Sequence, residues 1–99
     1  MPDAKKRVLI VDDEAPILRV LERLLSREHD ITGTTDPLEA LERLTVEHED
    51  FDVILCDVMM GRMDGVSFYQ EVTRRRPDLS GRFVFVTGGA LSEEQHLLL

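Results

Sequence analysis

Three apolar segments of this sequence are each followed directly by side chains that carry oxygen atoms. These side chains are Asp12, Asp13, Asp57 and Thr87, and they follow residues 8–11, 51–56 and 83–86. If the segments are adjacent parallel strands, the four side chains lie at the edge where open sheets of this kind bind ligands. Acids at strand ends also cap helices or face solvent, but three strands that end this way in order favour a site.

Carboxylates gathered at one edge of a sheet repel one another and raise one another's pKa. A divalent cation relieves this repulsion, and oxygen ligands suit Mg²⁺, which takes few protein ligands and keeps several waters. The pattern therefore predicts a magnesium site formed by Asp12, Asp13 and Asp57.

The chemistry expected of such a site is phosphoryl transfer. A carboxylate beside Mg²⁺ can attack phosphorus and form an aspartyl phosphate, and the metal neutralises charge on the transferred oxygens. The hydroxyl of Thr87 can hydrogen-bond a phosphate oxygen, and Gly88 has no side chain to block the approach to Asp57. Taken alone, Gly88-Gly89 is interpreted as a flexible turn between a strand and a helix.

Apolar runs typical of buried strands alternate with segments of helical periodicity along the chain. Strands are expected at 8–11, 30–34, 51–56 and 83–86, and helices at 16–28, 36–44, 64–76 and from 92 onward. This alternation predicts right-handed strand–helix–strand units and an α/β fold with a parallel sheet covered on both faces.

The composition predicts a single globular domain over residues 1–99, with 42% hydrophobic and 32% charged residues. The net charge of −8 argues against nucleic acid or an anionic membrane as a direct partner, because both require a basic surface. The one basic cluster, residues 74–76, is interpreted as the solvated end of a helix. No segment has the length of a signal peptide or a membrane span, so a cytoplasmic location is expected. The single cysteine, Cys56, is interpreted as a small core residue.

Four segments together resemble the response-regulator receiver family of two-component signalling. They are VLIVDDE at 8–14, FDVILCDVMM at 51–60, MDG at 63–65 and VFVTG at 84–88. The order and spacing fit from residue 7 to about residue 95. The resemblance implies a flavodoxin-like doubly wound parallel sheet with strand order 2-1-3-4.

The resemblance also implies a role for each matching residue. Asp57 would be the phosphoacceptor, Asp12 and Asp13 would hold Mg²⁺, Met59 would offer its backbone carbonyl to the metal, and Thr87 would be the switch hydroxyl. The partner implied is a sensor histidine kinase or a phosphotransfer domain that supplies the phosphoryl group from a phosphohistidine.

The sequence departs from the family pattern in two places. The family usually has proline where this chain has Gly61, and we expect some loss of rigidity near Met59. The family also has a fifth strand that ends in a lysine, followed by a fifth helix, whereas the only lysines here are Lys5 and Lys6. We therefore expect a receiver truncated before both elements. The fourth strand, 83–86, would then be an exposed edge through which the chain self-associates.

Two alternative functions remain open from the sequence. The first is a degenerate receiver that acts as a protein-interaction or assembly module without switching by phosphorylation. The second is a metal-dependent hydrolase with an aspartate nucleophile, but such enzymes commonly carry a second acid two residues after the nucleophile. That position is Met59 here, so this alternative ranks lowest.

Overall fold

The computed structural model describes residues 5–86, in which four strands alternate with helices. The elements are β1 (Arg7–Val11), α1 (Ala15–Leu25), β2 (Asp30–Thr34), α2 (Pro37–Thr45), β3 (Val53–Asp57), α3 (Gly65–Arg75), the 3₁₀ helix η1 (Pro77–Arg82) and β4 (Phe83–Val86). The predicted alternation is confirmed for this part of the chain. The helix expected from residue 92 onward, together with Thr87 and Gly88, lies outside the described residues.

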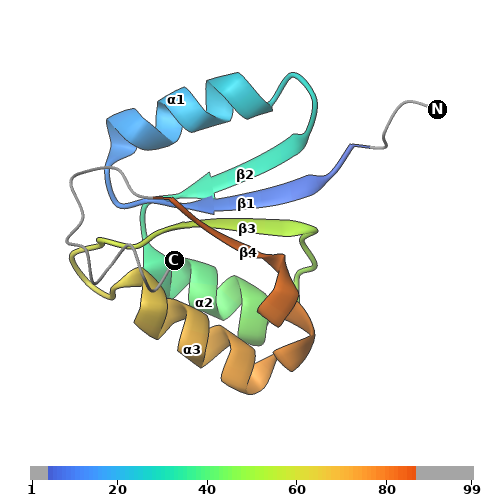
Figure 1. The fold of residues 1–99 in the computed structure, drawn as a ribbon, viewed down its shortest axis with the longest axis vertical. Helices are drawn as coiled ribbons and strands as arrows, with labels where there is room; N and C mark the ends of the chain where they lie inside the picture. Colours follow the sequence, from blue (N-terminus) through green and yellow to red (C-terminus); the bar gives the residue numbers. More distant parts are fainter. Residues whose placement is uncertain (1–4, 87–99) are drawn as a thin grey trace.

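The strands form one parallel sheet with the order β2-β1-β3-β4, as predicted. In the register, Val11 of β1 lies beside Cys56 of β3, and Asp57 lies beside Val86 of β4. Because all the strands run in the same direction, their carboxyl ends meet at a single edge (Figure 1). The residue that ends β3 and those that follow β1 are therefore neighbours.

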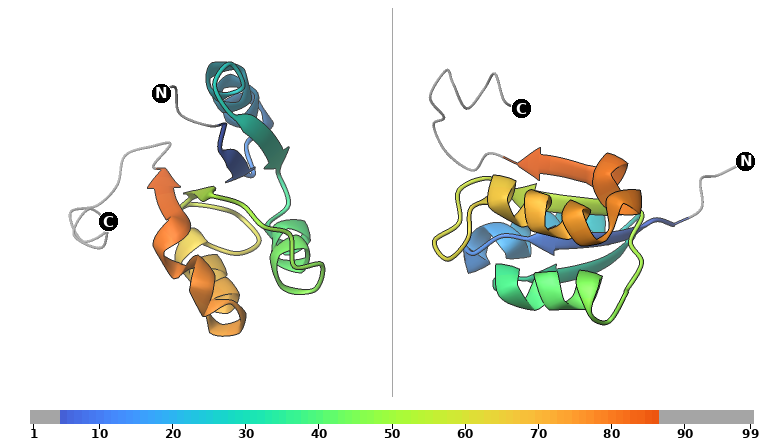
Figure 2. Two further views of the ribbon diagram at one scale, coloured as in Figure 1. Left: turned by 90° about the vertical axis from the view of Figure 1, so that its right-hand side faces the viewer. Right: turned by 90° about the horizontal axis from the view of Figure 1, so that it is seen from below.

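Helices cover both faces of the sheet. α1 lies on one face, and α2 and α3 lie side by side on the other (Figures 1 and 2). In β1, Val8 and Ile10 pack with Leu18 of α1, whereas Leu9 and Val11 belong to the larger core on the opposite face. Burial on both faces explains why β1 is a continuous apolar run rather than an alternating one. None of the helices within residues 5–86 has the length and apolar composition needed to cross a membrane.

Two element boundaries differ from the predictions. α1 ends at Leu25 rather than near Glu28, and the carbonyl oxygen of Leu25 accepts the N–H groups of Glu28 and His29 in the turn that follows. β3 begins at Val53 rather than at Phe51. Phe51 is buried, but its carbonyl oxygen accepts a hydrogen bond from the side chain of Arg82 rather than from a neighbouring strand.

The interpretation of residues 74–76 as a solvated helix end is wrong for Arg76. Arg74 and Arg75 are exposed and pair with Glu71, but the side chain of Arg76 is only 8% exposed. Its guanidinium donates to the carbonyl oxygens of Leu44 and Glu49 and to two carboxylates, those of Asp50 and Asp78.

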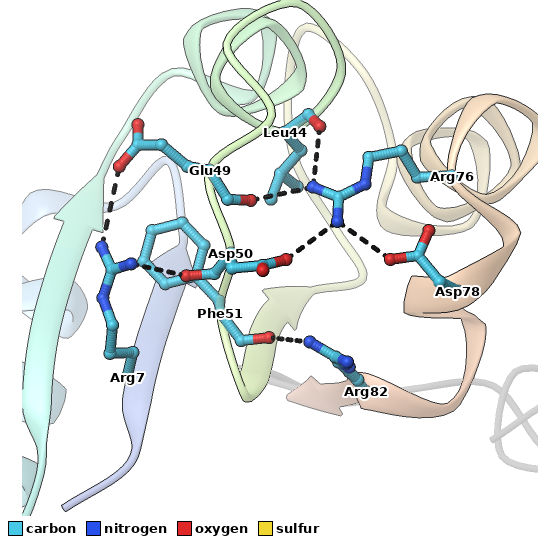
Figure 3. Close-up of polar contacts among 8 residues, drawn as sticks. All are labelled: Arg7, Leu44, Glu49, Asp50, Phe51, Arg76, Asp78 and Arg82. Carbon is cyan, nitrogen blue, oxygen red and sulfur yellow. Dashed lines mark hydrogen bonds and ion pairs between the residues drawn. The ribbon is translucent and has the colours of Figure 1, made fainter.

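Arg7 and Arg82 bind the same connecting segment as Arg76 (Figure 3). Arg7 donates to the carbonyl oxygen of Asp50 and stacks over the ring of Phe51, and Arg82 donates to the carbonyl oxygen of Phe51. We call Arg7, Arg76 and Arg82 the arginine clamp. The clamp supplies side-chain donors to backbone carbonyl oxygens of the segment that leads into β3, and it thereby fixes this segment.

Candidate functional site

Three carboxylates meet at the carboxyl edge of the sheet. Asp12 and Asp13 directly follow β1, Asp57 ends β3, and one oxygen atom from each lies within 4.8 Å of the others. Asp12 is 2% exposed and Asp57 is 4% exposed, whereas Asp13 is exposed. The structure thus brings together the three acids that the sequence pattern singled out.

Each of these carboxylates accepts a hydrogen bond from one backbone N–H group. Glu14 donates to Asp12 Oδ1 at 2.9 Å, and Met59 donates to Asp57 Oδ1 at 3.2 Å. Both of these bonds are local, with the donor two residues after the acid. The third is long-range: the N–H of Gly61, in the loop after β3, donates to Asp13 Oδ2 at 2.8 Å. The two loops at this edge are therefore joined through Asp13.

The electrostatics of the cluster favour the binding of a cation. Burial raises the pKa of Asp57 to about 6, with the nearby charges of Asp12 and Asp13 acting in the same direction and the Met59 N–H opposing them. Burial also raises the pKa of Asp12, against the effect of the Glu14 N–H. None of the ion pairs found within residues 5–86 involves these acids. Three converging oxygen donors with uncompensated charge fit a hard divalent cation such as Mg²⁺.

The start of α3 lies directly against the strand end that carries Asp57. The N–H of Gly65 donates to the carbonyl oxygen of Val58 at 2.9 Å. A β-carbon at Gly65 would overlap the carbonyl oxygen of Asp57 and lie 2.9 Å from Val58 Cα. Asp64 caps the helix by accepting the N–H of Ser67 at 2.8 Å. The sequence indicated a helix start at Asp64-Gly65, but not this contact between backbones.

The remaining candidate residues lie in different parts of the chain. Met59 is exposed beside Asp57, and its role as a carbonyl ligand stays a prediction. Thr87 and Gly88 lie outside the described residues, so their roles also stay predictions. Cys56 is fully buried, and burial raises the pKa of its thiol to about 12. This position in the core agrees with the interpretation of Cys56 as a packing residue.

Comparison with known proteins gives the family. Residues 8–97 match the response regulator receiver domain, and the chain belongs to this family. Its structure is similar to that of a response regulator receiver protein from Pseudomonas putida, with a TM-score of 0.76 and 26% identity over 96% of this chain and 77% of that one. It is also similar to the N-terminal domain of a response regulator receiver protein from Methanoculleus marisnigri JR1, with a TM-score of 0.76 and 25% identity over 94% of this chain and 75% of that one.

Curated relatives are longer than this chain. A protein-glutamate methylesterase/protein-glutamine glutaminase from Bradyrhizobium diazoefficiens is 42% identical over 80 residues, which cover 78% of this chain and 22% of that protein. The chain thus spans about a fifth of the length of the curated relatives that it matches first.

Proposed function

We propose that this chain is a phosphoacceptor receiver that takes a phosphoryl group onto Asp57 with Mg²⁺ bound by the neighbouring acids. The observation that carries the proposal is the convergence of Asp12, Asp13 and Asp57 within 4.8 Å at the carboxyl edge of the sheet. The family supports a histidine kinase or a phosphotransfer domain as the partner that supplies the phosphoryl group.

Asp57 is the nucleophile in the proposed reaction. One of its carboxylate oxygens attacks phosphorus and forms a new P–O bond, while the bond from phosphorus to the donor nitrogen of a phosphohistidine breaks. The electron pair of that bond stays on the imidazole, which takes up a proton. The Met59 N–H, bonded to Asp57 Oδ1, holds the carboxylate in a fixed orientation and leaves its other oxygen for the attack.

Asp12 and Asp13, together with Asp57 and the carbonyl oxygen of Met59, would hold the cation. When bound, Mg²⁺ supplies positive charge that offsets the charge on the acids and on the transferred oxygens. At neutral pH the carboxylate of Asp57 is largely ionised, because its pKa of about 6 lies below 7. Thr87 would hydrogen-bond the new phosphate, and Gly88 would leave room for it, as the family resemblance implies.

We also propose that the edge of β4 mediates self-association. Within the described residues, β4 is paired with β3 alone, and its Val84 is 50% exposed. An apolar edge strand can pair with a strand of another chain. Light scattering should show a species larger than a monomer that Val84→Lys disrupts, and a monomer at every concentration would contradict the proposal.

Phosphorylation with a small donor tests the main proposal. The full chain is incubated with acetyl phosphate and Mg²⁺, and intact-mass spectrometry follows the addition of a phosphoryl group. We expect a single addition that EDTA prevents and that Asp57→Asn abolishes, whereas Asp30→Asn, at the opposite end of the sheet, leaves it intact. Binding of Mg²⁺ without any modification would instead indicate a receiver that serves only as an interaction module. Sustained release of phosphate would indicate a hydrolase.

A further inference from the structure

We propose that Gly61 is a positioning residue for the cation site, and that it acts through its backbone N–H on Asp13. The inference rests on the proposed function, because it assigns a role toward the cation that Asp12, Asp13 and Asp57 would share. It concerns how the third carboxylate is kept in place, which neither the sequence pattern nor the family resemblance indicated.

Asp13 differs from the other two acids in its surroundings. Asp12 and Asp57 are buried, and each is held by an N–H from its own loop. Asp13 is exposed, so an unrestrained side chain would turn toward water and away from two like charges. The hydrogen bond from Gly61, at 2.8 Å and across 48 positions of sequence, opposes that movement.

The hydrogen bond to Asp13 requires a backbone N–H at position 61, but it does not require that the residue be glycine. A β-carbon there would lie 3.5 Å from Asp13 Oδ2, which is an ordinary van der Waals contact. Among the described glycines none has a positive φ, so the backbone of Gly61 suits other residues too. Alanine therefore keeps the hydrogen bond. Proline, which the family usually has at this position, has no N–H and removes it.

A hydrogen bond to a ligating carboxylate orders the ligand before the metal arrives. Such outer contacts commonly change metal affinity by about tenfold or more when they are lost. The bond also joins the loop after β1 to the loop that carries Met59, because Gly61 lies two positions beyond Met59. The Gly61 N–H therefore connects two loops that both contribute predicted ligands.

The test compares Gly61→Pro with Gly61→Ala in a calorimetric titration of the full chain with MgCl₂. We expect Gly61→Ala to bind Mg²⁺ as the unchanged chain does, and Gly61→Pro to bind about tenfold more weakly. Urea unfolding in EDTA checks that both variants are folded. Equal affinity of two folded variants would overturn the inference.

Hydrogen exchange gives a second test that needs neither metal nor a folded proline variant. In EDTA, Asp13→Ala should speed exchange of the Gly61 amide at least severalfold and leave the Met59 amide, which is bonded to Asp57, unchanged. An unaltered Gly61 amide would refute the inference. A chain that binds no Mg²⁺ but passes this test would refute the proposed function and leave the contact between Gly61 and Asp13 standing.

Discussion

Gly65 and Asp57 lie in backbone contact at the carboxyl edge of the sheet, with no room for a β-carbon between them. The Gly65 N–H is at the same time bonded to the carbonyl oxygen of Val58. α3 therefore begins against the strand end that carries the proposed phosphoacceptor. A change at Gly65 has to move either the helix or the strand end.

Gly65→Ala should destabilise the protein by about 2–3 kcal/mol, because the new methyl group would overlap backbone atoms. Backbone atoms, unlike the end of a flexible side chain, cannot change rotamer to relieve the overlap. Urea unfolding measures the loss. Gly81→Ala is the matched control, since a β-carbon at Gly81 has nothing within 4 Å. We expect it to change the free energy of unfolding by less than about 0.5 kcal/mol. Equal effects of the two substitutions would contradict the contact described for Gly65.

The raised pKa of Asp57 gives a second prediction, for the protein without metal. A folded-state pKa of about 6, against 3.8 for an ordinary aspartate, means that the folded state holds the proton more tightly. The contribution of protonated Asp57 to the free energy of unfolding is fully present below pH 3.8 and is lost as the pH rises through 6. Asparagine does not ionise, so Asp57→Asn should not show this decrease in stability. At pH 7 in EDTA the variant should be more stable by on the order of 2 kcal/mol.

Chemical unfolding of both proteins between pH 4 and pH 8 measures this difference. Titrating groups far from position 57 cancel because they are the same in both proteins, whereas Asp12 and Asp13 also lose a neighbouring charge in the variant. Added Mg²⁺ should stabilise the unchanged chain and have little effect on Asp57→Asn, since a ligand that binds the folded state raises its stability. A variant that is less stable than the unchanged chain at pH 7 in EDTA would contradict the raised pKa of the carboxylate at position 57.

The arginine clamp gives a third prediction. Arg76→Ala removes the donors that reach the carbonyl oxygens of Leu44 and Glu49. Buried acceptors left without partners are costly, so we expect a loss of about 2–4 kcal/mol in the free energy of unfolding. Arg75→Ala is the control, because Arg75 is exposed and its ion pair is with Glu71 on the surface of the same helix. Similar urea midpoints for the two variants would show that the buried contacts of Arg76 do not contribute to stability.

The positions of the acids could be predicted because they depend on a simple rule of chain geometry. Apolar runs that end in Asp12-Asp13 and in Asp57 predict strand ends, and parallel strands place those ends together. The cluster of three carboxylates followed from this rule, whereas the order of the strands was supplied by the family resemblance.

The contacts of Arg76, Gly61 and Gly65 could not be predicted from the sequence. Arg76 follows two exposed arginines in a helical segment, and only the packing of η1 and of the segment before β3 shows that it is buried. Gly61 and Gly65 make their contacts through backbone atoms, and the types and spacing of side chains do not predict such contacts. Their partners, Asp13 and the carbonyl oxygen of Val58, are set by how the loops meet.

The proposed function depends most on whether Asp12, Asp13 and Asp57 share one cation. Nuclear magnetic resonance of the ¹⁵N-labelled chain with substoichiometric Mn²⁺, a paramagnetic substitute for Mg²⁺, locates the ion directly. We expect the amide signals of Glu14, Met59 and Gly61 to broaden first, because those amides bond the three carboxylates. Signals from the opposite end of the sheet should stay sharp, and an excess of Mg²⁺ should restore the broadened ones. Broadening spread evenly over the acidic surface, or centred on Asp50 and Asp78 beside the arginine clamp, would contradict the account.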